Sequence, residues 1–124
     1  MIDERRRAKI KIIINEVPLS KNKYLNMHWA SCMKYKNDIA WLLCQKKGFL
    51  ITPNKATVTF NIYFKTNRKR DIQNYLGGGL IAWLDELVDQ DFIIDDSNDC
   101  IGQPIVNFYI DKANPRTEII IEGR

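Results

Sequence analysis

Residues 56–64, ATVTFNIYF, carry the clearest structural signal in the chain, because strongly apolar side chains recur there at every second position. Successive side chains of a strand point to opposite faces, so a period of two predicts a strand with one face in a hydrophobic core. The face expected in the core consists of Ala56, Val58, Phe60, Ile62 and Phe64. The face expected to point away from it consists of Thr57, Thr59, Asn61 and Tyr63.

Three further strands are predicted around this one, at residues 8–14 (AKIKIII), 104–110 and 117–122. The segment KANPRT, residues 112–117, is typical of a turn and predicts that the last two strands form a hairpin. Two loops complete this set. Residues 15–27 contain Pro and several Asn and Ser residues, and residues 49–54 contain Pro53 and Asn54.

Two helices are predicted from apolar residues that recur at intervals of three and four. The first covers about 28–47, with Gly48 as its stop signal, and the second covers about 72–89. The buried stripe expected for the first helix consists of Trp29, Cys32, Met33, Ala40, Leu43 and Cys44. That of the second consists of Leu76, Leu80, Trp83, Leu84 and Leu87.

Three consecutive glycines, residues 77–79, interrupt the second predicted helix and are unfavourable there by about 1 kcal/mol each relative to Ala. Two explanations are open: the helix begins after them, or another backbone or a ligand approaches so closely that no side chain fits. The overall order is β-α-β-α-β-β, in a chain of 124 residues with 45% hydrophobic and 27% charged residues. We therefore predict one α+β domain over residues 1–124, with a mixed sheet and helices packed on it.

The chain carries no apolar run long enough to span a bilayer, and residues 1–11, MIDERRRAKIK, lack the apolar segment of a signal peptide. A cytoplasmic protein without membrane association is the expectation. Cys32, Cys44 and Cys100 are odd in number and include no Cys-x-x-Cys pair. We expect three reduced thiols, and neither a disulfide framework nor a zinc site.

Charge is distributed unevenly along the chain, whose net charge is +4. Residues 1–70 hold 16 Lys and Arg against 4 Asp and Glu, which gives +12, whereas residues 71–124 hold 3 against 11, which gives −8. The two halves can simply attract one another within one domain. The alternative is a cationic surface for a polyanion around a carboxylate cluster. The candidate phosphate contacts are Lys21, Lys23, Arg68, Lys69 and Arg70.

Two segments hold carboxylates that are candidates for a metal site. Asp71 directly follows the basic run at 68–70, and the turn near residue 97 holds Asp95, Asp96 and Asp99. Mg²⁺ prefers such hard oxygen ligands, and in phosphodiester hydrolysis it holds the phosphate and activates water. The structural alternative is that acidic turns are simply well solvated, and that Asp71 and Asp85 cap or flank the second helix.

Other catalytic arrangements have less support. His28 is the only histidine, so a triad or a His-rich zinc site must use it. At the start of a predicted helix, His28 is expected to cap or pack, with substrate contact as the alternative. The glycines at 77–79 are not followed by Lys and Ser or Thr, which argues against a nucleotide-binding P-loop.

The segment RDIQNYLGGGLIAWLDELVDQDFIIDDSND, residues 70–99, resembles the core motif of the RusA-type Holliday junction resolvases. That motif is a basic residue, then Asp-x-Asp-Asn, a helix, a short apolar stretch and Asp-Asp-Ser. PLSKNKYLNMHWA at 18–30 is similar to the family's N-terminal loop and following helix, and NPRTEIIIE at 114–122 to its closing strand. The resemblance covers nearly the whole chain.

The resemblance implies a RusA-like fold and a homodimer that cuts branched DNA, such as a four-way junction, with Mg²⁺, or Mn²⁺ as the alternative ion. By matching position, Asp71 is the first metal ligand and Asp96 the late one, with Asp95 beside it. Asn74 matches the Asn of the motif, and Asp99 is a reserve ligand or water-orienting group. These implications predict a structure-specific endodeoxyribonuclease in DNA recombination and repair, of phage or prophage type.

Two positions depart from the family pattern. Gln73 replaces the second Asp of the motif, and its neutral amide carbonyl is a weaker ligand that cannot act as a base. The family's catalytic Lys is also missing, because Gly77 or Ile81 stands near its position and Lys112 is the only lysine after residue 70. The alternative function is therefore a RusA-like protein that binds junctions or a protein partner without cleavage. The third hypothesis is an unrelated binding protein whose acidic residues are only part of the solvated surface.

Overall fold

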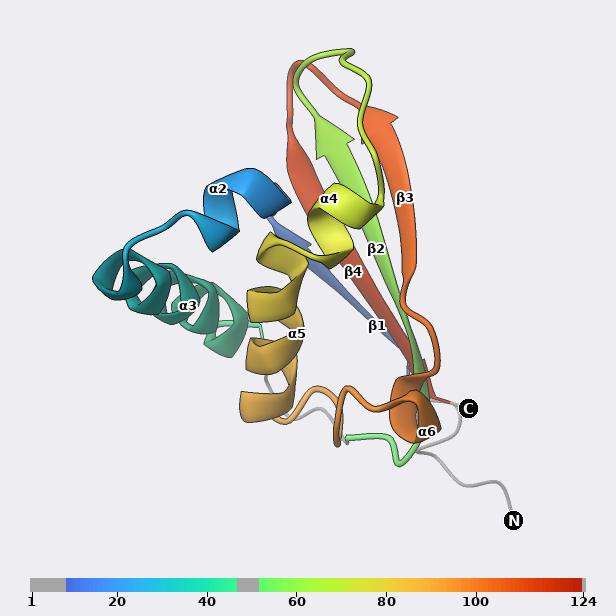
Figure 1. The fold of residues 1–124 in the computed structure, drawn as a ribbon. Helices are drawn as coiled ribbons and strands as arrows, with labels where there is room; N and C mark the ends of the chain where they lie inside the picture. The colour runs from blue at the N-terminus through green and yellow to red at the C-terminus, as the bar shows by residue number, and fades with distance from the viewer. Residues whose placement is uncertain (1–8, 47–51, 124) are drawn as a thin grey trace.

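The computed structural model describes residues 9–46 and 52–123, which form a four-stranded sheet and five helices (Figure 1). The predicted α+β class is confirmed. The elements are β1 (Lys9–Ile14), α2 (Lys21–Leu25), α3 (Trp29–Cys44), β2 (Ala56–Phe64), α4 (Gln73–Leu76), α5 (Gly79–Asp89), α6 (Asn98–Ile101), β3 (Ile105–Ile110) and β4 (Arg116–Gly123). Residue 8 of the first predicted strand, Lys47 and Gly48 of the first predicted helix and residues 49–51 of the predicted turn lie outside the described residues.

The sheet has the strand order β1-β4-β2-β3. β4 runs antiparallel to both β1 and β2, whereas β2 and β3 are parallel, so the sheet is mixed as predicted. Parallel neighbours need a crossover connection, and the segment that contains α4, α5 and α6 supplies it. Figure 1 shows α3 and α5 on the same side of the sheet.

The predicted hairpin between the last two strands is wrong. β2 lies between β3 and β4, so these two strands do not pair. The Asp111 amide donates to the Phe64 carbonyl at 2.8 Å, and Arg116 at the start of β4 pairs with Tyr63. The turn at residues 111–115 was predicted correctly. It carries the chain from β3 across the end of β2, so that β4 pairs with the other edge of β2.

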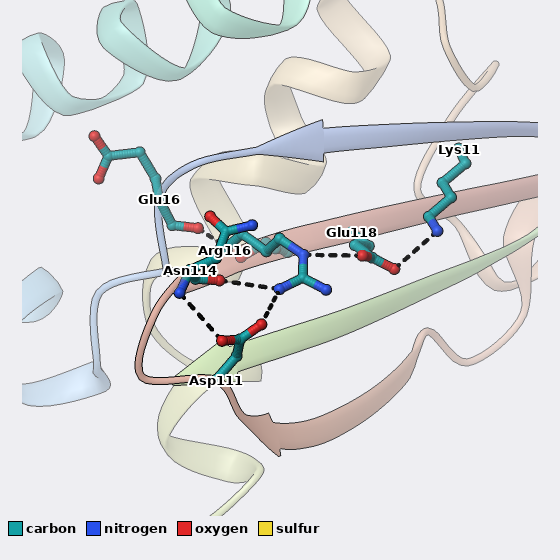
Figure 2. Close-up of polar contacts among 7 residues, drawn as sticks. Lys11, Glu16, Asp111, Asn114, Arg116 and Glu118 are labelled. Carbon is teal, nitrogen blue, oxygen red and sulfur yellow. Dashed lines mark hydrogen bonds and ion pairs between the residues drawn. The ribbon is translucent and has the colours of Figure 1, made fainter. Parts of the chain in front are cut away.

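A charged network fixes this crossing (Figure 2). The Arg116 guanidinium donates to the Glu118 carboxylate at 3.0 Å, to the Asp111 carboxylate at 2.8 Å and to the Asn114 carbonyl at 3.0 Å. Lys11 pairs with the other oxygen of Glu118 at 3.2 Å. Burial alone would raise the pKa of Glu118, but the hydrogen bonds from Lys11 and Arg116 outweigh it and lower that pKa. Arg116 therefore serves the fold.

The alternation in β2 is confirmed, since the five predicted core residues are buried and the residues between them are half-buried. The stripe of the second predicted helix is also largely confirmed. Leu80, Trp83 and Leu87 of α5 are fully buried, and Leu76 and Leu84 pack against the core. This stripe is what holds α5 in the core.

The stripe predicted for the first helix is largely wrong. Of its six residues only Leu43 is buried, and Trp29 and Met33 are 74% and 45% exposed. Ile39 is the second buried residue of α3, and Tyr35 packs beside it. The helix has two apolar faces, and residue spacing does not tell which of them packs against the rest of the fold.

The glycine segment ends α4 and begins α5 at a place where two backbones touch. The Gly79 amide donates to the Leu19 carbonyl at 2.7 Å. A Cβ on Gly78 would lie 2.5 Å from the Lys21 nitrogen, and a Cβ on Gly79 would lie 2.4 Å from the Leu19 nitrogen. The predicted helix 72–89 is therefore two helices, α4 and α5, and α5 begins at the last glycine and not after all three. The second explanation applies, because the neighbouring backbone leaves no space for a side chain at Gly78 or Gly79.

Replacing Gly78 or Gly79 with Ala is expected to destabilise the protein by about 1–3 kcal/mol or more, because the new methyl group meets backbone that cannot move aside. Gly77→Ala is the matched control, since its Cβ would approach the nearest atom, the Gln73 carbonyl oxygen, only to 3.1 Å. Chemical denaturation of the three variants checks this order. Equal unfolding midpoints for Gly77→Ala and Gly78→Ala would contradict it.

Candidate nucleic-acid interface

Two basic segments far apart in the sequence meet at one end of the sheet. The segment 17–23 and the loop that leaves β2 line an open pocket of about 240 Å³. Its cationic lining residues are Lys23, Lys65, Arg68 and Arg70. The remaining lining residues are Val17, Pro18, Leu19, Ser20, Phe64, Thr66 and Tyr75. The structure thus brings one of the two predicted lysines of the N-terminal loop to the predicted arginines.

The predicted N-terminal loop contains the short helix α2, which presents its lysines outward. The Ser20 side chain caps this helix by accepting a hydrogen bond from the Lys23 amide at 3.5 Å. Lys21 and Lys23 are both exposed. The Lys21 side chain runs past Gly77, where a Cβ would lie 3.7 Å from Lys21 Cδ. The Lys21 side chain therefore lies against Gly77.

Arg70 organises the loop that carries the other cations. Its guanidinium donates to the carbonyl oxygens of Thr66 and Arg68 at 2.8 and 3.1 Å and to the Thr66 hydroxyl at 2.9 Å. The same group lies 3.8 Å from the centre of the Phe64 ring, which is a cation–π contact. Most of its hydrogen-bonding capacity is thus used within the loop, and Arg70 positions Arg68.

The other cations here have no acidic partner among the residues that the structure describes. Within residues 9–46 and 52–123, Lys21, Lys23, Lys65, Arg68 and Lys69 form no salt bridge, and all five are exposed. Cations elsewhere in the sheet and helices, such as Lys11 and Lys36, do pair with carboxylates. Uncompensated positive charge gathered on one surface attracts polyanions.

Aromatic side chains lie beside these cations. A second open pocket, of about 270 Å³, shares Phe64, Arg68 and Arg70 with the first. Its other lining residues are Asn67, Phe108, Tyr109 and Ile110. Tyr109 is stacked on Tyr63 with ring centres 4.9 Å apart. The residues of β3 and Lys65 were not among the contacts predicted from the sequence. Only the strand order places the end of β3 next to this loop.

Asp71, Gln73 and Asn74 lie at the start of α4, and all three are exposed. The Asp71 carboxylate accepts a hydrogen bond from the Gln73 amide at 3.0 Å, and its carbonyl accepts one from the Asn74 amide at 3.0 Å. Asp71 thus forms a local turn before α4. It does not cap that helix, because the N-cap position is Ile72 and no side chain bonds to the cap.

Asp95 and Asp96 lie in a different place. Together with Lys36, Asp85, Val88 and Asp89 they line an open pocket of about 280 Å³. Lys36 pairs with Asp85 at 3.2 Å, and this hydrogen bond raises the pKa of Lys36. Asp99 lies in the first turn of α6 and does not line this pocket. Among the described residues it belongs to no group of His, Cys, Asp and Glu side chains that could hold a metal ion. Lys36 therefore compensates one of the four aspartates that line this pocket.

The structure does not bring Asp71 together with Asp95 and Asp96. α5 separates them, and its 11 residues span roughly 16 Å. Figure 1 shows α4 and the segment after α5 at opposite ends of this helix. Among the described residues, no three His, Cys, Asp or Glu side chains form a group that could hold a metal ion. As placed here, these residues do not fit one Mg²⁺ ion shared by the three aspartates.

The remaining candidates have structural roles. His28 caps α3, because its Nδ1 accepts a hydrogen bond from the Ala30 amide at 3.2 Å. Within the described part of the chain, Cys32, Cys44 and Cys100 form no disulfide. Of the described helices, none has the length and apolar character required to cross a membrane.

Comparison with known proteins adds no assignment. No protein-family model matches the chain, and no curated protein matches it either.

Arg68 and Arg70 are expected to differ when each is replaced by Ala. Arg70→Ala removes three hydrogen bonds and a ring contact, so it should lower the free energy of unfolding by about 1–2 kcal/mol. Arg68→Ala, which removes an exposed and unpaired cation, should leave stability unchanged. Urea unfolding of both variants measures the difference. A larger loss for Arg68→Ala would refute the assignment of roles.

Glu86 of α5 gives a pH-dependent prediction. Burial, reinforced by Asp89, raises the pKa of this carboxyl group in the folded state. Wild-type stability is therefore expected to fall as the pH rises from the ordinary value of 4.5 through the raised pKa, since unfolding then releases a proton. Glu86→Gln should unfold at a higher temperature than wild type at pH 7 and lose that advantage below pH 4.5. An equal advantage at both pH values would exclude ionisation as the cause.

Proposed function

We propose that this protein binds branched DNA through the surface formed by Lys21, Lys23, Lys65, Arg68 and Lys69. The observation that carries the proposal is that these exposed cations gather at one end of the sheet without acidic partners among the described residues. Lys and Arg contacts to phosphates supply affinity and orientation without reading sequence. The surface is thus suited to a substrate recognised by its shape.

The arrangement favours a nucleic acid over a small anion. The cations come from two separate segments. Lys23, Lys65 and Arg68 line one open pocket, and Arg68 also lines the second. A single phosphate would touch few of them, whereas a phosphate backbone passes several. Phe108 and Tyr109 add ring surface at the edge of the second pocket, and unpaired bases of branched DNA can stack on such rings.

The resemblance to RusA-type resolvases supports the same substrate class and adds a homodimer. A four-way junction offers equivalent strands to two copies of a protein, so a symmetric pair of basic surfaces matches it. We propose that the protein acts in the cytoplasm, on the DNA that it binds there. The missing acid at Gln73, the missing lysine and the separated aspartates favour binding without cleavage.

Cleavage is the second candidate function. It is favoured by the order of Asp71, Asn74 and the Asp-Asp-Ser segment, and by the four aspartates, Asp85, Asp89, Asp95 and Asp96, that line one pocket. In this reading the protein is a Mg²⁺- or Mn²⁺-dependent endonuclease of recombination and repair. Within the described residues of one chain, the aspartates do not fit one shared ion.

A gel shift in Ca²⁺ with a labelled four-way junction and a linear duplex of equal length tests binding. We expect tighter binding of the junction and an affinity that falls steeply with salt, because bound phosphates release counterions. Arg68→Ala should weaken binding by roughly tenfold and make the salt dependence shallower. Lys55→Ala is the matched control, since Lys55 is exposed at the opposite end of β2.

The same substrates in Mg²⁺ and then Mn²⁺ separate the hypotheses. Binding without products supports the proposal, whereas symmetric nicking of the junction alone establishes the endonuclease. Gln73→Asp should then raise the rate. No binding of either substrate, or equal losses for Arg68→Ala and Lys55→Ala, would refute the proposed surface and leave the unrelated binding role.

A further inference from the structure

The outward face of α3 carries large apolar side chains that the described parts of the chain leave in solvent. Trp29 is 74% exposed, Trp41 65% and Met33 45%. Together with Asn37 these residues follow one another at intervals of four, which places them in one row along the helix. Soluble proteins seldom leave such a row uncovered, so this face marks an interaction surface.

We propose that a second copy of this chain covers this row, with the two α3 helices antiparallel about a two-fold axis near Asn37. The inference deepens the proposed homodimer and rests on that part of the proposed function, not on DNA binding. In this arrangement Met33 of one copy lies opposite Trp41 of the other, and the pair occurs twice. Methionine sulfur packs favourably against aromatic rings.

Asn37 is the first observation that favours a second copy over another occupant. It is the polar residue at the centre of an otherwise apolar row, and it is exposed. On a two-fold axis it meets its own copy, and an amide carries both donor and acceptor, so two Asn37 side chains can bond to each other. A single central Asn in an apolar helix interface is a known means of fixing register.

The charges beside the row are the second observation. Lys34 and Asp38 pair with each other along α3 at 2.8 Å, and both are exposed. An antiparallel partner centred near Asn37 sets Lys34 of one helix close to Asp38 of the other, because their positions along the axis differ by about two residues, or roughly 3 Å. The face is therefore complementary to itself in charge as well as in shape.

The surface also argues against DNA as its occupant. Lys34 is already compensated by Asp38 within the helix. The unpaired cations of the proposed DNA surface lie on α2 and on the loop after β2. Each indole buries roughly 150–250 Å² when it is covered. Four indoles in two copies thus provide a substantial part of the interface that a stable dimer needs.

Sedimentation velocity of the full chain without DNA, over a range of concentrations, tests the inference. We expect a monomer–dimer equilibrium and a dissociation constant that rises about 30-fold or more in Trp41→Ala, the effect of losing an interface hot spot. Ile105→Ala is the control, because Ile105 is similarly apolar and 46% exposed but lies on β3. Circular dichroism verifies that each variant is folded.

A pair of charge variants tests the geometry without removing an apolar group. Lys34→Glu makes positions 34 and 38 both acidic and Asp38→Lys makes them both basic, so each variant alone should dimerise more weakly than wild type. Mixing the two should restore dimers that contain one copy of each. If the two substitutions acted only by breaking the Lys34–Asp38 pair within one helix, mixing the variants would not restore dimers.

Three results would overturn the inference: a single-chain mass at every concentration, a dimer unaffected by Trp41→Ala, or charge variants that fail to pair when mixed. A monomer that still binds the junction would leave the DNA surface in place and remove only this interface. A dimer that binds no DNA would leave this interface in place and remove the proposed DNA surface.

Discussion

The contact of Gly78 and Gly79 with the backbone at Leu19–Lys21 is the constraint on which the charged surface depends. It fixes the corner between α4 and α5 against the segment that leads into α2. The Tyr35 hydroxyl reinforces this corner by accepting hydrogen bonds from the Leu19 amide at 3.3 Å and the Trp83 indole at 2.7 Å. Burial raises the pKa of Tyr35, so the hydroxyl stays neutral. The N-terminal lysines are thereby held near the loop that follows β2.

Local periodicity predicted the elements whose burial is one-sided. β2 has one apolar face and α5 one dominant stripe, and both were placed correctly. α3 has two apolar faces, one with Ile39 and Leu43 and one with Trp29 and Trp41, and no property of the helix alone decides between them. The false hairpin has a similar origin. Turn residues show that the chain reverses at residues 111–115, but not which strand the returning chain joins.

The candidate site was predictable in its components but not in its assembly. The basic residues Lys23 and Arg68 were identified from charge, but their meeting depends on the contact of Gly78 and Gly79 with the backbone at residues 19–21. The contribution of Tyr109 depends on the strand order. The aspartates matched a sequence pattern, whereas their separation follows from the length of α5, which a motif does not encode.

The pairing of β1 with β4 has a consequence for how the protein is made. Ile12 of β1 lies opposite Ile119 of β4, so the first described strand has its only sheet neighbour near the end of the described chain. During synthesis on the ribosome, β1 and its buried Ile12 and Ile14 must wait without a partner until β4 emerges. Contacts between such distant segments slow folding. Nascent chains of this protein thus expose an apolar strand that chaperones can bind.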